Sequence, residues 1–425
     1  YVRGLAHYSC ARGPSYPPAT IYRLWRWCSM GEEPVKDSKS FVIFSAQYPP
    51  HMGGVEFFTR NIARALAGLG HRVLIVTNDT EGLGAGLSEE EGLEILRLPC
   101  HPLFSGRLPL PLNNSERRAL LRRLNSRRFD GVLVNARFYP HSLLGMRLAR
   151  SMGLTPVVLD HGSAWLSFSK PLLDPIVRLY ERSLTMYGKR RYKPRYYGVS
   201  KKSSEWLNTF GIRSCGEIGN SIDALEYRDQ ASARDFKKEL GLSGDAFIVA
   251  FVGRLIPEKG VRVLIEESQS DALVKRGVVF LLAGDGPLAS EVEAAQGLSL
   301  RWLGRLGRYD VSALLQQANV LCLPTRSEGF STTLLEASAC GCPSIVTDVG
   351  GARELIPSED FGTIIPTSGV VDVIDACLNL ADNRDLAEAQ GKKCREWVEN
   401  SFSWRASASS LVDAFNMSCH YSRVL

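Results

Sequence analysis

Short apolar runs alternate with amphipathic stretches along most of the chain from Phe41 onwards. The run FVIFSA at 41–46 has the length and bulk of a buried strand, and apolar residues recur at helical spacing within 55–71. RVLIVTN at 72–78 is a second buried run. Strand, helix and strand in this order predict a β-α-β unit of a parallel sheet.

The same rhythm continues in both halves of the chain, separated by a polar stretch at 220–245. Further strands are predicted at 131–135, 156–160, 195–200, 246–253, 278–284, 300–304, 320–324, 343–348 and 362–366. This alternation predicts an α/β fold of two doubly wound, Rossmann-like domains that face each other across a cleft. The expected division is an N-terminal extension at 1–39, a first domain at 40–220, a second domain at 221–400 and a C-terminal helix at 401–425 that packs back on the first domain.

Composition narrows the class of protein. The 425 residues are 44% hydrophobic and 23% charged, which is typical of a globular chain with an ample core. The longest apolar runs fall far short of the ~20 residues that span a bilayer. Ten cysteines without a C-x-x-C pair predict free thiols in a reducing cytosol.

The first 29 residues have neither strand nor helix periodicity and lack the compact apolar segment of a signal peptide. Met30 precedes a polar stretch and then the first strand. We therefore expect the natural protein to start at Met30, an ordered N-terminal arm being the alternative.

The unusual loops of the second half all follow strands, where parallel sheets bind their ligands. In GRLIPEKG at 253–260, Gly253 would let the backbone approach a ligand, while Arg254 and Lys259 place two cations at a helix N-terminus. This combination predicts an anion site. Two glycine turns, AGDGPL with Gly284 and Gly286 and WLGRL with Gly304, are weaker signals because such turns are common.

The stretch EGFSTTLLE at 328–336 places two glutamates eight positions apart. Residues 329–332 stand at the start of a predicted helix, where unpaired N–H groups and the helix dipole favour a phosphate. Eight helical residues span about 12 Å, roughly the separation of ribose and sugar in a sugar nucleotide. Glu336 could therefore bind ribose hydroxyls and Glu328 sugar hydroxyls, unless both are ordinary surface acids.

Together these motifs resemble glycosyltransferase family 4, the retaining group with the GT-B fold. The resemblance covers about 41–405 and is strongest at 247–355. It is carried by Gly253-Arg254-Leu255 with Glu258-Lys259-Gly260, by Gly284-Asp285-Gly286-Pro287-Leu288, by Leu303-Gly304, by Glu328/Glu336 with Gly329-Phe330, and by GGVE at 53–56.

The resemblance implies roles for individual residues. The catalytic residues would be Arg254 and Lys259 on the diphosphate, Glu328 facing the transferred sugar, and His161 of LDHGSAW beside that sugar. The remaining donor-binding residues would be Gly54, Gly253, Gly284, Gly286, Gly304, Gly329, Phe330, Ser331, Thr332 and Glu336.

Transfer in this family proceeds with retention, and the cations stabilise the leaving group. The chain has no D-x-D motif, so we expect a metal-independent reaction without a cofactor. GNSID at 219–223 departs from the family pattern, because Ser221 replaces the usual glycine; no role is therefore assigned to Asn220.

Positive charge is concentrated in the first half. Residues 101–220 hold 21 Lys and Arg against 7 Asp and Glu, whereas the whole chain has a net charge of only +6. The segments 115–128 and 165–197 mix these cations with apolar residues, which suits either an anionic membrane surface or a solvated helix face. The resemblance implies a UDP- or GDP-sugar donor and a glycan or polyprenyl- or lipid-linked acceptor, in a cytoplasmic protein attached peripherally to the inner face of the plasma membrane.

The leading hypothesis is a hexosyltransferase of surface polysaccharide or glycolipid synthesis. A non-hydrolysing sugar-nucleotide epimerase and a non-catalytic nucleotide-sugar-binding module are the alternatives. Nucleic acid binding is not expected, because no recognition motif accompanies the charge. An NAD-dependent dehydrogenase is disfavoured because no G-x-G-x-x-G follows the first strand.

Overall fold

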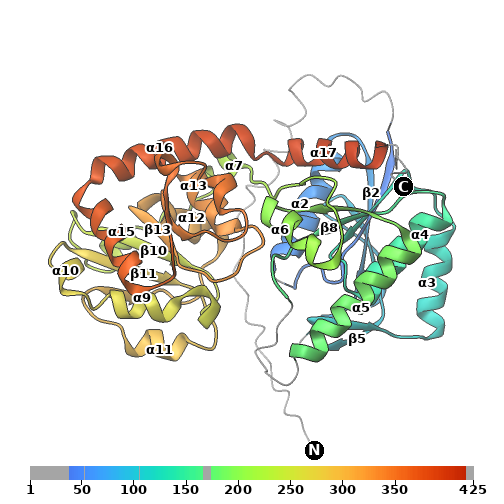
Figure 1. The fold of residues 1–425 in the computed structure, drawn as a ribbon, viewed down its shortest axis with the longest axis horizontal. Coiled ribbons are helices and arrows are strands. Elements are labelled where there is room, and N and C mark those ends of the chain that lie inside the picture. Colours follow the sequence, from blue (N-terminus) through green and yellow to red (C-terminus); the bar gives the residue numbers. More distant parts are fainter. Residues whose placement is uncertain (1–37, 52, 105, 166–173, 418–425) are drawn as a thin grey trace, which may run out of the picture. The chain divides into compact units, whose positions relative to one another are not determined.

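Two sheets of mainly parallel strands, one in each half of the chain, organise the protein in a computed structural model that describes residues 38–51, 53–104, 106–165 and 174–417 (Figure 1). The expectations for residues 1–37, including the start at Met30, lie outside the described residues. The α/β class with two doubly wound domains is confirmed.

The first sheet has the strand order β3-β4-β2-β1-β7-β8-β9, in which every neighbouring pair is parallel except β3 and β4. Its strands are β1 (Ser40–Phe44), β2 (Arg72–Asn78), β3 (Gly86–Glu90), β4 (Leu93–Leu98), β7 (Gly131–Asn135), β8 (Val157–Asp160) and β9 (Arg195–Gly198). A separate hairpin joins β5 (Cys100–Leu103) and β6 (Leu108–Pro111). The helices are α2 (Gly54–Gly68), α3 (Ser115–Asn125), α4 (Pro140–Ser151), α5 (Asp174–Tyr192), α6 (Lys201–Trp206) and the 3-10 turn η1 (Leu207–Phe210).

The second sheet has the order β12-β11-β10-β13-β14-β15 and is parallel throughout. Its strands are β10 (Phe247–Val252), β11 (Val278–Ala283), β12 (Leu300–Trp302), β13 (Val320–Leu323), β14 (Ser344–Thr347) and β15 (Thr363–Ile365). The helices are α7 (Ala224–Asp229), α8 (Phe236–Glu239), α9 (Val261–Glu267), α10 (Asp271–Val274), α11 (Ala289–Ala294), α12 (Arg308–Gln317), α13 (Thr332–Cys340), α14 (Ala352–Leu355), α15 (Val370–Asp382), α16 (Arg384–Ser401) and α17 (Trp404–Asn416). Two 3-10 turns, η2 (Pro257–Lys259) and η3 (Glu359–Phe361), complete the half.

Side-chain alternation along β1 explains why helices cover both faces of the first sheet. Phe41 and Ile43 point into the core that includes the apolar face of α2, whereas Val42 and Phe44 point into the core that includes residues of α4. All four are almost fully buried. A strand buried on both faces reads as a continuous apolar run, which is why the sequence predicted it.

Strands β4, β5 and β6 have no counterpart among the predicted strands, and neither has β3. Its sequence, GLSEE, is largely polar and partly exposed because the strand lies at the sheet edge. The turn into β4 has positive φ at Glu91 (52°) and Gly92 (77°), the conformation of a two-residue hairpin. Hydrophobic periodicity therefore gave no signal where turn geometry determines the pairing.

The C-terminal helix α17 packs against α2 of the first half (Figure 1). The ring of Phe415 stacks on Phe41 with centroids 4.9 Å apart. A Cβ at Gly131 would lie 2.5 Å from the ring of Phe415, so this strand position has no room for a side chain. The first half is thus built from two separate segments of the chain.

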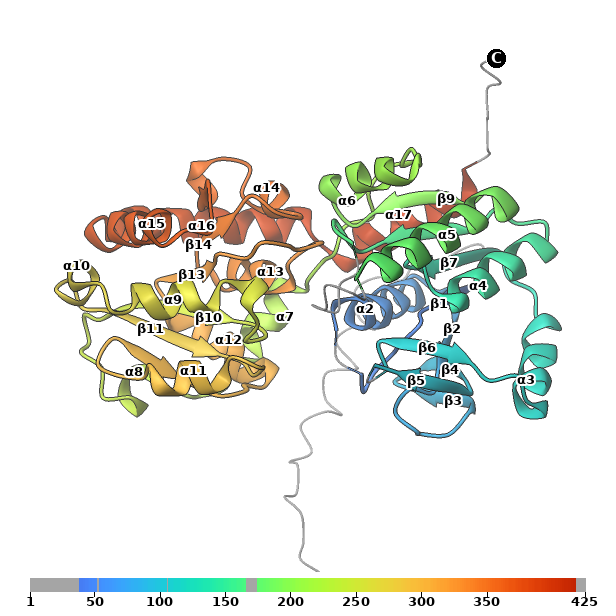
Figure 2. The ribbon, with the colours of Figure 1, turned by 60° about the horizontal axis from the view of Figure 1, so that its bottom comes forward.

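Helix α5 runs beside α4 (Figure 2). Among the described residues, no helix combines the length and apolar character required to cross a bilayer. The seven cysteines in the described ranges are free thiols.

Candidate functional site

A cavity of about 550 Å³ is lined by loops of both halves, and each main loop follows a parallel strand. From the first half come the loops after β1, β7 and β8, together with the first turn of α2. From the second half come the loops after β10 and β13. The carboxyl ends of parallel strands share one edge of a sheet, so loops that are far apart in sequence meet here.

Part of the charged lining of this cavity belongs to the second half. Arg254 and Lys259 follow β10, and Glu328 follows β13. Lys259 Nζ forms an ion pair with Glu328 Oε2, and both side chains are largely buried at 22% exposure. A diphosphate entering the cavity would compete with Glu328 for Lys259, which would free the carboxylate to accept hydroxyl groups.

His161 lines the same cavity from the end of β8. Asn135 Nδ2 donates to Thr59 Oγ1 at 2.8 Å, which turns Asn135 Oδ1 toward His161 Nε2 at 3.0 Å. Desolvation lowers the pKa of His161 to about 3, so the imidazole is neutral in the physiological range. This bond pattern assigns the proton to Nε2 and leaves Nδ1 as an acceptor.

Of the residues predicted from the sequence, the structure thus brings five to one cavity: His161, Arg254, Lys259, Glu328 and Gly329. Gly54 is the first residue of α2, next to Val55 and Glu56, which do line the cavity. Among the described residues, no group of three or more His, Cys, Asp or Glu side chains is arranged to hold a metal ion.

The glycine turns of the second half hold its loops against one another. Gly284 has φ of +148°, and a Cβ there would lie 1.8 Å from the carbonyl oxygen of Gly253. Gly286 has φ of +155° and would place a Cβ 2.6 Å from the carbonyl oxygen of Leu255. The N–H of Gly284 donates to the carbonyl of Gly304 at 2.8 Å. None of these four glycines lines the cavity; loop-to-loop packing is what requires Gly284 and Gly286.

Two of the predicted phosphate-binding residues at the start of α13 have structural roles. Ser331 caps the helix, with its Oγ accepting from the N–H of Leu334 at 3.2 Å. Phe330 is 8% exposed and belongs to the core, with Gly351 packed directly against its ring. The backbone of this loop borders the cavity at Gly329, whereas the Phe330 side chain points away from it.

Glu336 lines a second, smaller cavity of about 60 Å³, together with Thr332. Its neighbours there include Tyr227 and Arg308. Burial raises the pKa of Glu336 to about 7, although the nearby Arg308 opposes this shift. The structure therefore does not place Glu336 in the cavity that contains Glu328.

Sequence reasoning missed a buried ionic cluster in the floor of the large cavity. Arg137 Nη1 donates to both carboxylate oxygens of Asp160, at 2.6 and 2.5 Å, and Arg137 Nη2 pairs with Glu181. Its guanidinium also lies 4.0 Å from the ring centroid of Phe210. Burial raises the pKa of Asp160, while Arg137 opposes the shift. The available signal was an Arg and an Asp at the ends of two adjacent buried strands.

Glu56 was also missed. It lies in the first turn of α2, is 5% exposed and lines the large cavity. Burial raises the pKa of its carboxyl. The sequence motif GGVE contained this residue, but its helical position alone did not indicate that it faces the cavity.

Some of the arginines in the basic segments of the first half are buried or paired, and others are exposed. In 115–128, Arg117 is buried with Nη1 3.4 Å from the carbonyl oxygen of Pro99, and Arg127 forms a bidentate pair with Glu94 at 2.9 Å. The exposed cations of that segment are Arg118, Arg122, Arg123 and Arg128. The segment 165–197 includes residues outside the described ranges.

Within its described part, α5 exposes large apolar residues next to several arginines. Ile176 and Leu179 are 64% and 67% exposed. The exposed arginines of the helix are Arg178, Arg182, Arg190 and Arg191.

Two family profiles match most of the folded chain. One, described as Glycosyltransferase Family 4, matches residues 52–224, and the other, described as Glycosyl transferases group 1, matches residues 246–383. Each profile falls on one of the two sheets.

Curated relatives agree with these profiles. A D-inositol 3-phosphate glycosyltransferase of Saccharomonospora viridis is 30% identical over 215 residues, which span 47% of this chain and about half (49%) of that protein. The enzyme of the same name from Kribbella flavida is 26% identical over 85% of this chain and 90% of its own length. A GDP-mannose-dependent phosphatidylinositol monomannoside mannosyltransferase of Mycobacterium tuberculosis is 29% identical over 49% of this chain and 58% of its own length.

Solved structures share the fold at low identity. Sucrose-phosphate synthase from Thermosynechococcus elongatus superposes with a TM-score of 0.68 at 18% identity, over 89% of this chain and 98% of that chain. HepE of Anabaena in complex with UDP-glucose gives a TM-score of 0.66 at 16% identity, over 89% and 99% of the two chains. The predicted GT-B fold is confirmed. This chain therefore belongs to glycosyltransferase family 4 and is a hexosyltransferase.

Proposed function

We propose that the enzyme transfers a hexose with retention from a UDP- or GDP-sugar to a glycan or lipid-linked acceptor, without a metal ion. The observation that carries this proposal is the large cavity in which Arg254, Lys259 and Glu328 of one half face His161 of the other. Relatives and structural neighbours whose names include GDP-mannose and UDP-glucose support a nucleotide-sugar donor.

The donor diphosphate would bind to Arg254 and Lys259. When the bond from the anomeric carbon to the phosphate oxygen breaks, negative charge develops on that oxygen, and two fixed cations in a partly dehydrated cavity stabilise it. They supply the positive charge that a divalent ion supplies elsewhere. Neutral His161 and the carboxylate of Glu328 would contact the sugar.

The acceptor hydroxyl would attack from the same face that the phosphate leaves. Its oxygen forms the new bond to the anomeric carbon, and its proton passes to the departing phosphate oxygen. This step needs no protein nucleophile. Glu56 and Arg107 of the first half, which line the large cavity, would bind acceptor hydroxyls or phosphates.

The role of Glu336 as a ribose ligand is retained as part of this proposal. Its separate cavity adjoins Thr332 at the start of α13, and its carboxyl can accept hydroxyl hydrogens there once ionised. Replacing Glu336 with glutamine should weaken binding of UDP as well as of a UDP-sugar, whereas loss of a contact to the sugar alone would weaken only the latter.

The donor is tested by a thermal-shift screen against UDP-, GDP- and ADP-sugars. A ligand at 100 times its Kd stabilises the folded state by about 2.7 kcal/mol, so selective binding raises the melting temperature. Radiolabelled transfer from the selected donor should persist in EDTA. Loss of transfer in EDTA that Mg²⁺ restores would contradict the metal-independent part.

Product analysis separates the two alternatives. A new epimer of the sugar nucleotide without acceptor would favour the epimerase, with Glu56 as the acid-base candidate that sequence reasoning did not find. Tight donor binding without turnover across an acceptor panel would favour the non-catalytic module.

Attachment to an anionic membrane surface is the second part of the proposal. The apolar residues of α5 can enter the headgroup region while its arginines contact anionic lipid. Changing Ile176 and Leu179 to serine should lower binding to phosphatidylglycerol-containing vesicles about thirtyfold, since each of the two exposed side chains contributes on the order of 1 kcal/mol when buried.

The matched control for this prediction is Leu225→Ser, which removes a 57% exposed leucine on α7 of the other half. It should leave vesicle binding unchanged. Equal losses in both variants, or binding that is insensitive to salt, would argue against the proposed lipid contact.

A further inference from the structure

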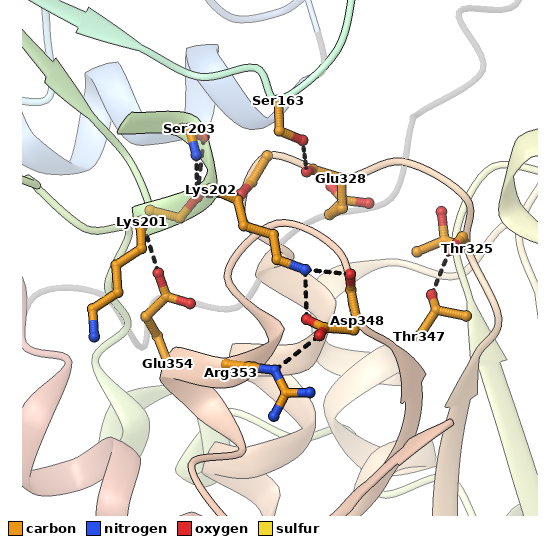
Figure 3. A network of polar contacts seen from close by, with 12 residues as sticks. Ser163, Lys201, Lys202, Ser203, Thr325, Glu328, Thr347, Asp348, Arg353 and Glu354 are labelled. Atoms are coloured by element: carbon orange, nitrogen blue, oxygen red, sulfur yellow. Dashed lines mark hydrogen bonds and ion pairs between the residues drawn. The ribbon is translucent and has the colours of Figure 1, made fainter. Parts of the chain in front are cut away.

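Two serines of the first half donate hydrogen bonds to the peptide segment that contains Glu328. Ser163 Oγ, from the loop after β8, donates to the carbonyl oxygen of Glu328 at 2.5 Å (Figure 3). Ser200 Oγ, at the start of α6, donates to the carbonyl oxygen of Gly329 at 3.0 Å. Both carbonyls belong to the loop between β13 and α13 of the second half.

Two glycines allow neighbouring backbone to pack closely around this segment. Gly350 has φ of +53°, and a Cβ there would lie 2.6 Å from the carbonyl oxygens of both Glu328 and Gly329. On the other side, a Cβ at Gly329 would lie 1.9 Å from the carbonyl oxygen of His161. The segment is therefore enclosed between the second half's own loop and the backbone of the first half.

Further polar contacts join α6 of the first half to the second half near these two serines. Lys202 Nζ of α6 pairs with Asp348 Oδ1 at 2.5 Å, and Arg353 Nε donates to the other oxygen of Asp348 at 2.8 Å. The N–H of Lys201, which has no partner within its helix, donates to Glu354 Oε1 at 2.7 Å. Figure 3 shows these contacts side by side with the Ser163–Glu328 bond.

We propose that a clamp between the two halves positions the Glu328–Gly329 segment for sugar transfer. The clamp consists of Ser163, Ser200, Lys201 and Lys202 of the first half. The inference rests on the proposed function and goes beyond it. Residues of the first half would position Glu328, a residue of the second half that would contact the donor sugar. Arg254 and Lys259 can hold a nucleoside diphosphate from the second half alone. Glu328 is also paired with Lys259, but the backbone carbonyls of its loop accept hydrogen bonds from the clamp serines of the first half.

The clamp can position the loop because several hydrogen bonds and an ion pair cross between the two halves. Each hydroxyl-to-carbonyl bond contributes a modest net stabilisation, but a carbonyl deprived of its buried donor also carries the desolvation cost of an unsatisfied group. Removing one clamp serine therefore shifts the loop away from the arrangement in which Glu328 can contact the sugar. Binding of the nucleotide alone should be unaffected.

The decisive variant is Ser163→Ala, because Ser163 lies in a loop and caps no helix. We expect kcat for the sugar nucleotide selected in the thermal-shift screen to fall about tenfold, the size of one lost hydrogen bond in a site of this kind. The Kd of UDP or GDP alone should stay within about twofold of the unmodified enzyme. The matched control is Ser151→Ala, which removes an equivalent bond, from Ser151 Oγ to the carbonyl of Leu148 at 2.8 Å, within α4 of the same half.

Ser200 needs a separate control because it also caps α6, its Oγ accepting from the N–H of Ser203 at 3.1 Å. Ser200→Ala should lower kcat, whereas Ser200→Thr, which keeps the hydroxyl, should restore most of it. Asn114→Ala removes the cap of α3 in the same half without touching the clamp, and should lower stability but not kcat.

Several outcomes would overturn the clamp. Ser163→Ala with unchanged kcat would do so, as would an equal loss in Ser151→Ala or a parallel loss of UDP or GDP binding. These results differ from failure of the proposed function, in which the unmodified enzyme itself neither binds nor consumes a sugar nucleotide.

Discussion

Replacing Lys259 with methionine is expected to lower kcat for sugar transfer by about 10²–10³-fold, the usual effect of removing one fixed charge-stabilising group from an active site. Lys259 is one of two cations on the donor side of the large cavity. Its ammonium group is paired with Glu328 before the donor binds, and a bound diphosphate would take over this contact, so the charge would lie beside the leaving phosphate. Methionine retains the length of the side chain but removes the charge.

The measurement is a steady-state assay with radiolabelled donor, in which kcat and KM are determined separately. Lys275→Met, an exposed lysine of the same half, is the control and should behave as the unmodified enzyme. If Lys259→Met raises KM alone, the lysine binds the ground state and the transition state equally, and its assigned role in stabilising the leaving group is wrong.

Replacing Glu267 with methionine is expected to stabilise the protein by about 3 kcal/mol at pH 7, calculated from the pKa difference below. Glu267 ends α9 and is fully buried, and within the described part of the chain neither of its carboxyl oxygens has a hydrogen-bond partner. Desolvation, with a smaller contribution from nearby Cys377, raises its pKa from 4.5 to about 10. A carboxylate at the C-terminal end of a helix is also disfavoured by the helix dipole.

The sign of the pH dependence follows from proton uptake. Between pH 4.5 and about 10, the folded protein keeps the Glu267 proton and the unfolded chain releases it. The unfolded chain therefore binds fewer protons, and stability falls as pH rises, by about 1.4 kcal/mol per unit from this group. The contribution of Glu267 to the free energy of unfolding is fully present below pH 4.5 and is lost progressively above it.

Denaturant unfolding at pH 6 and pH 8 tests this expectation. The advantage of Glu267→Met over the unmodified protein should widen by about 3 kcal/mol between the two values. Glu293→Met is the control, because Glu293 is an exposed glutamate on α11 of the same half. Parallel pH curves for the unmodified protein and Glu267→Met would mean that the buried carboxyl is ionised in the folded state.

The ends of the strands could be predicted from the sequence, and most of the predicted residues that line the large cavity were found because they follow those ends. Arg254, Lys259 and Glu328 each follow an apolar run, as does His161. In a parallel sheet all such positions lie at one edge, so periodicity predicted that the residues of the second half would meet, whereas the family resemblance implied that His161 of the first half lies beside the same sugar. The polar edge strand β3 escaped the same reasoning, because a strand with one partner and exposed side chains has no apolar run.

Side-chain direction could not be read in this way. Phe330 and Glu336 belong to the same motif as Glu328, yet one enters the core and the other a separate small cavity. Helical spacing gives the distance along an axis, but which neighbour each face meets depends on how α13 packs against α7 and α12. Glu56 and Arg137 became visible as cavity residues only after that packing was known.

The sequence by itself determined the two parallel sheets, the edge at which their loops gather and the cations placed there, because these follow from local periodicity and from the common direction of parallel strands. Tertiary structure decided the rest. Gly284 serves loop packing, Asp160 pairs with Arg137, and Ser163 reaches across to Glu328. Each of these depends on atoms that are distant in sequence and come within bonding or contact distance only when separate elements pack, a condition that no local pattern encodes.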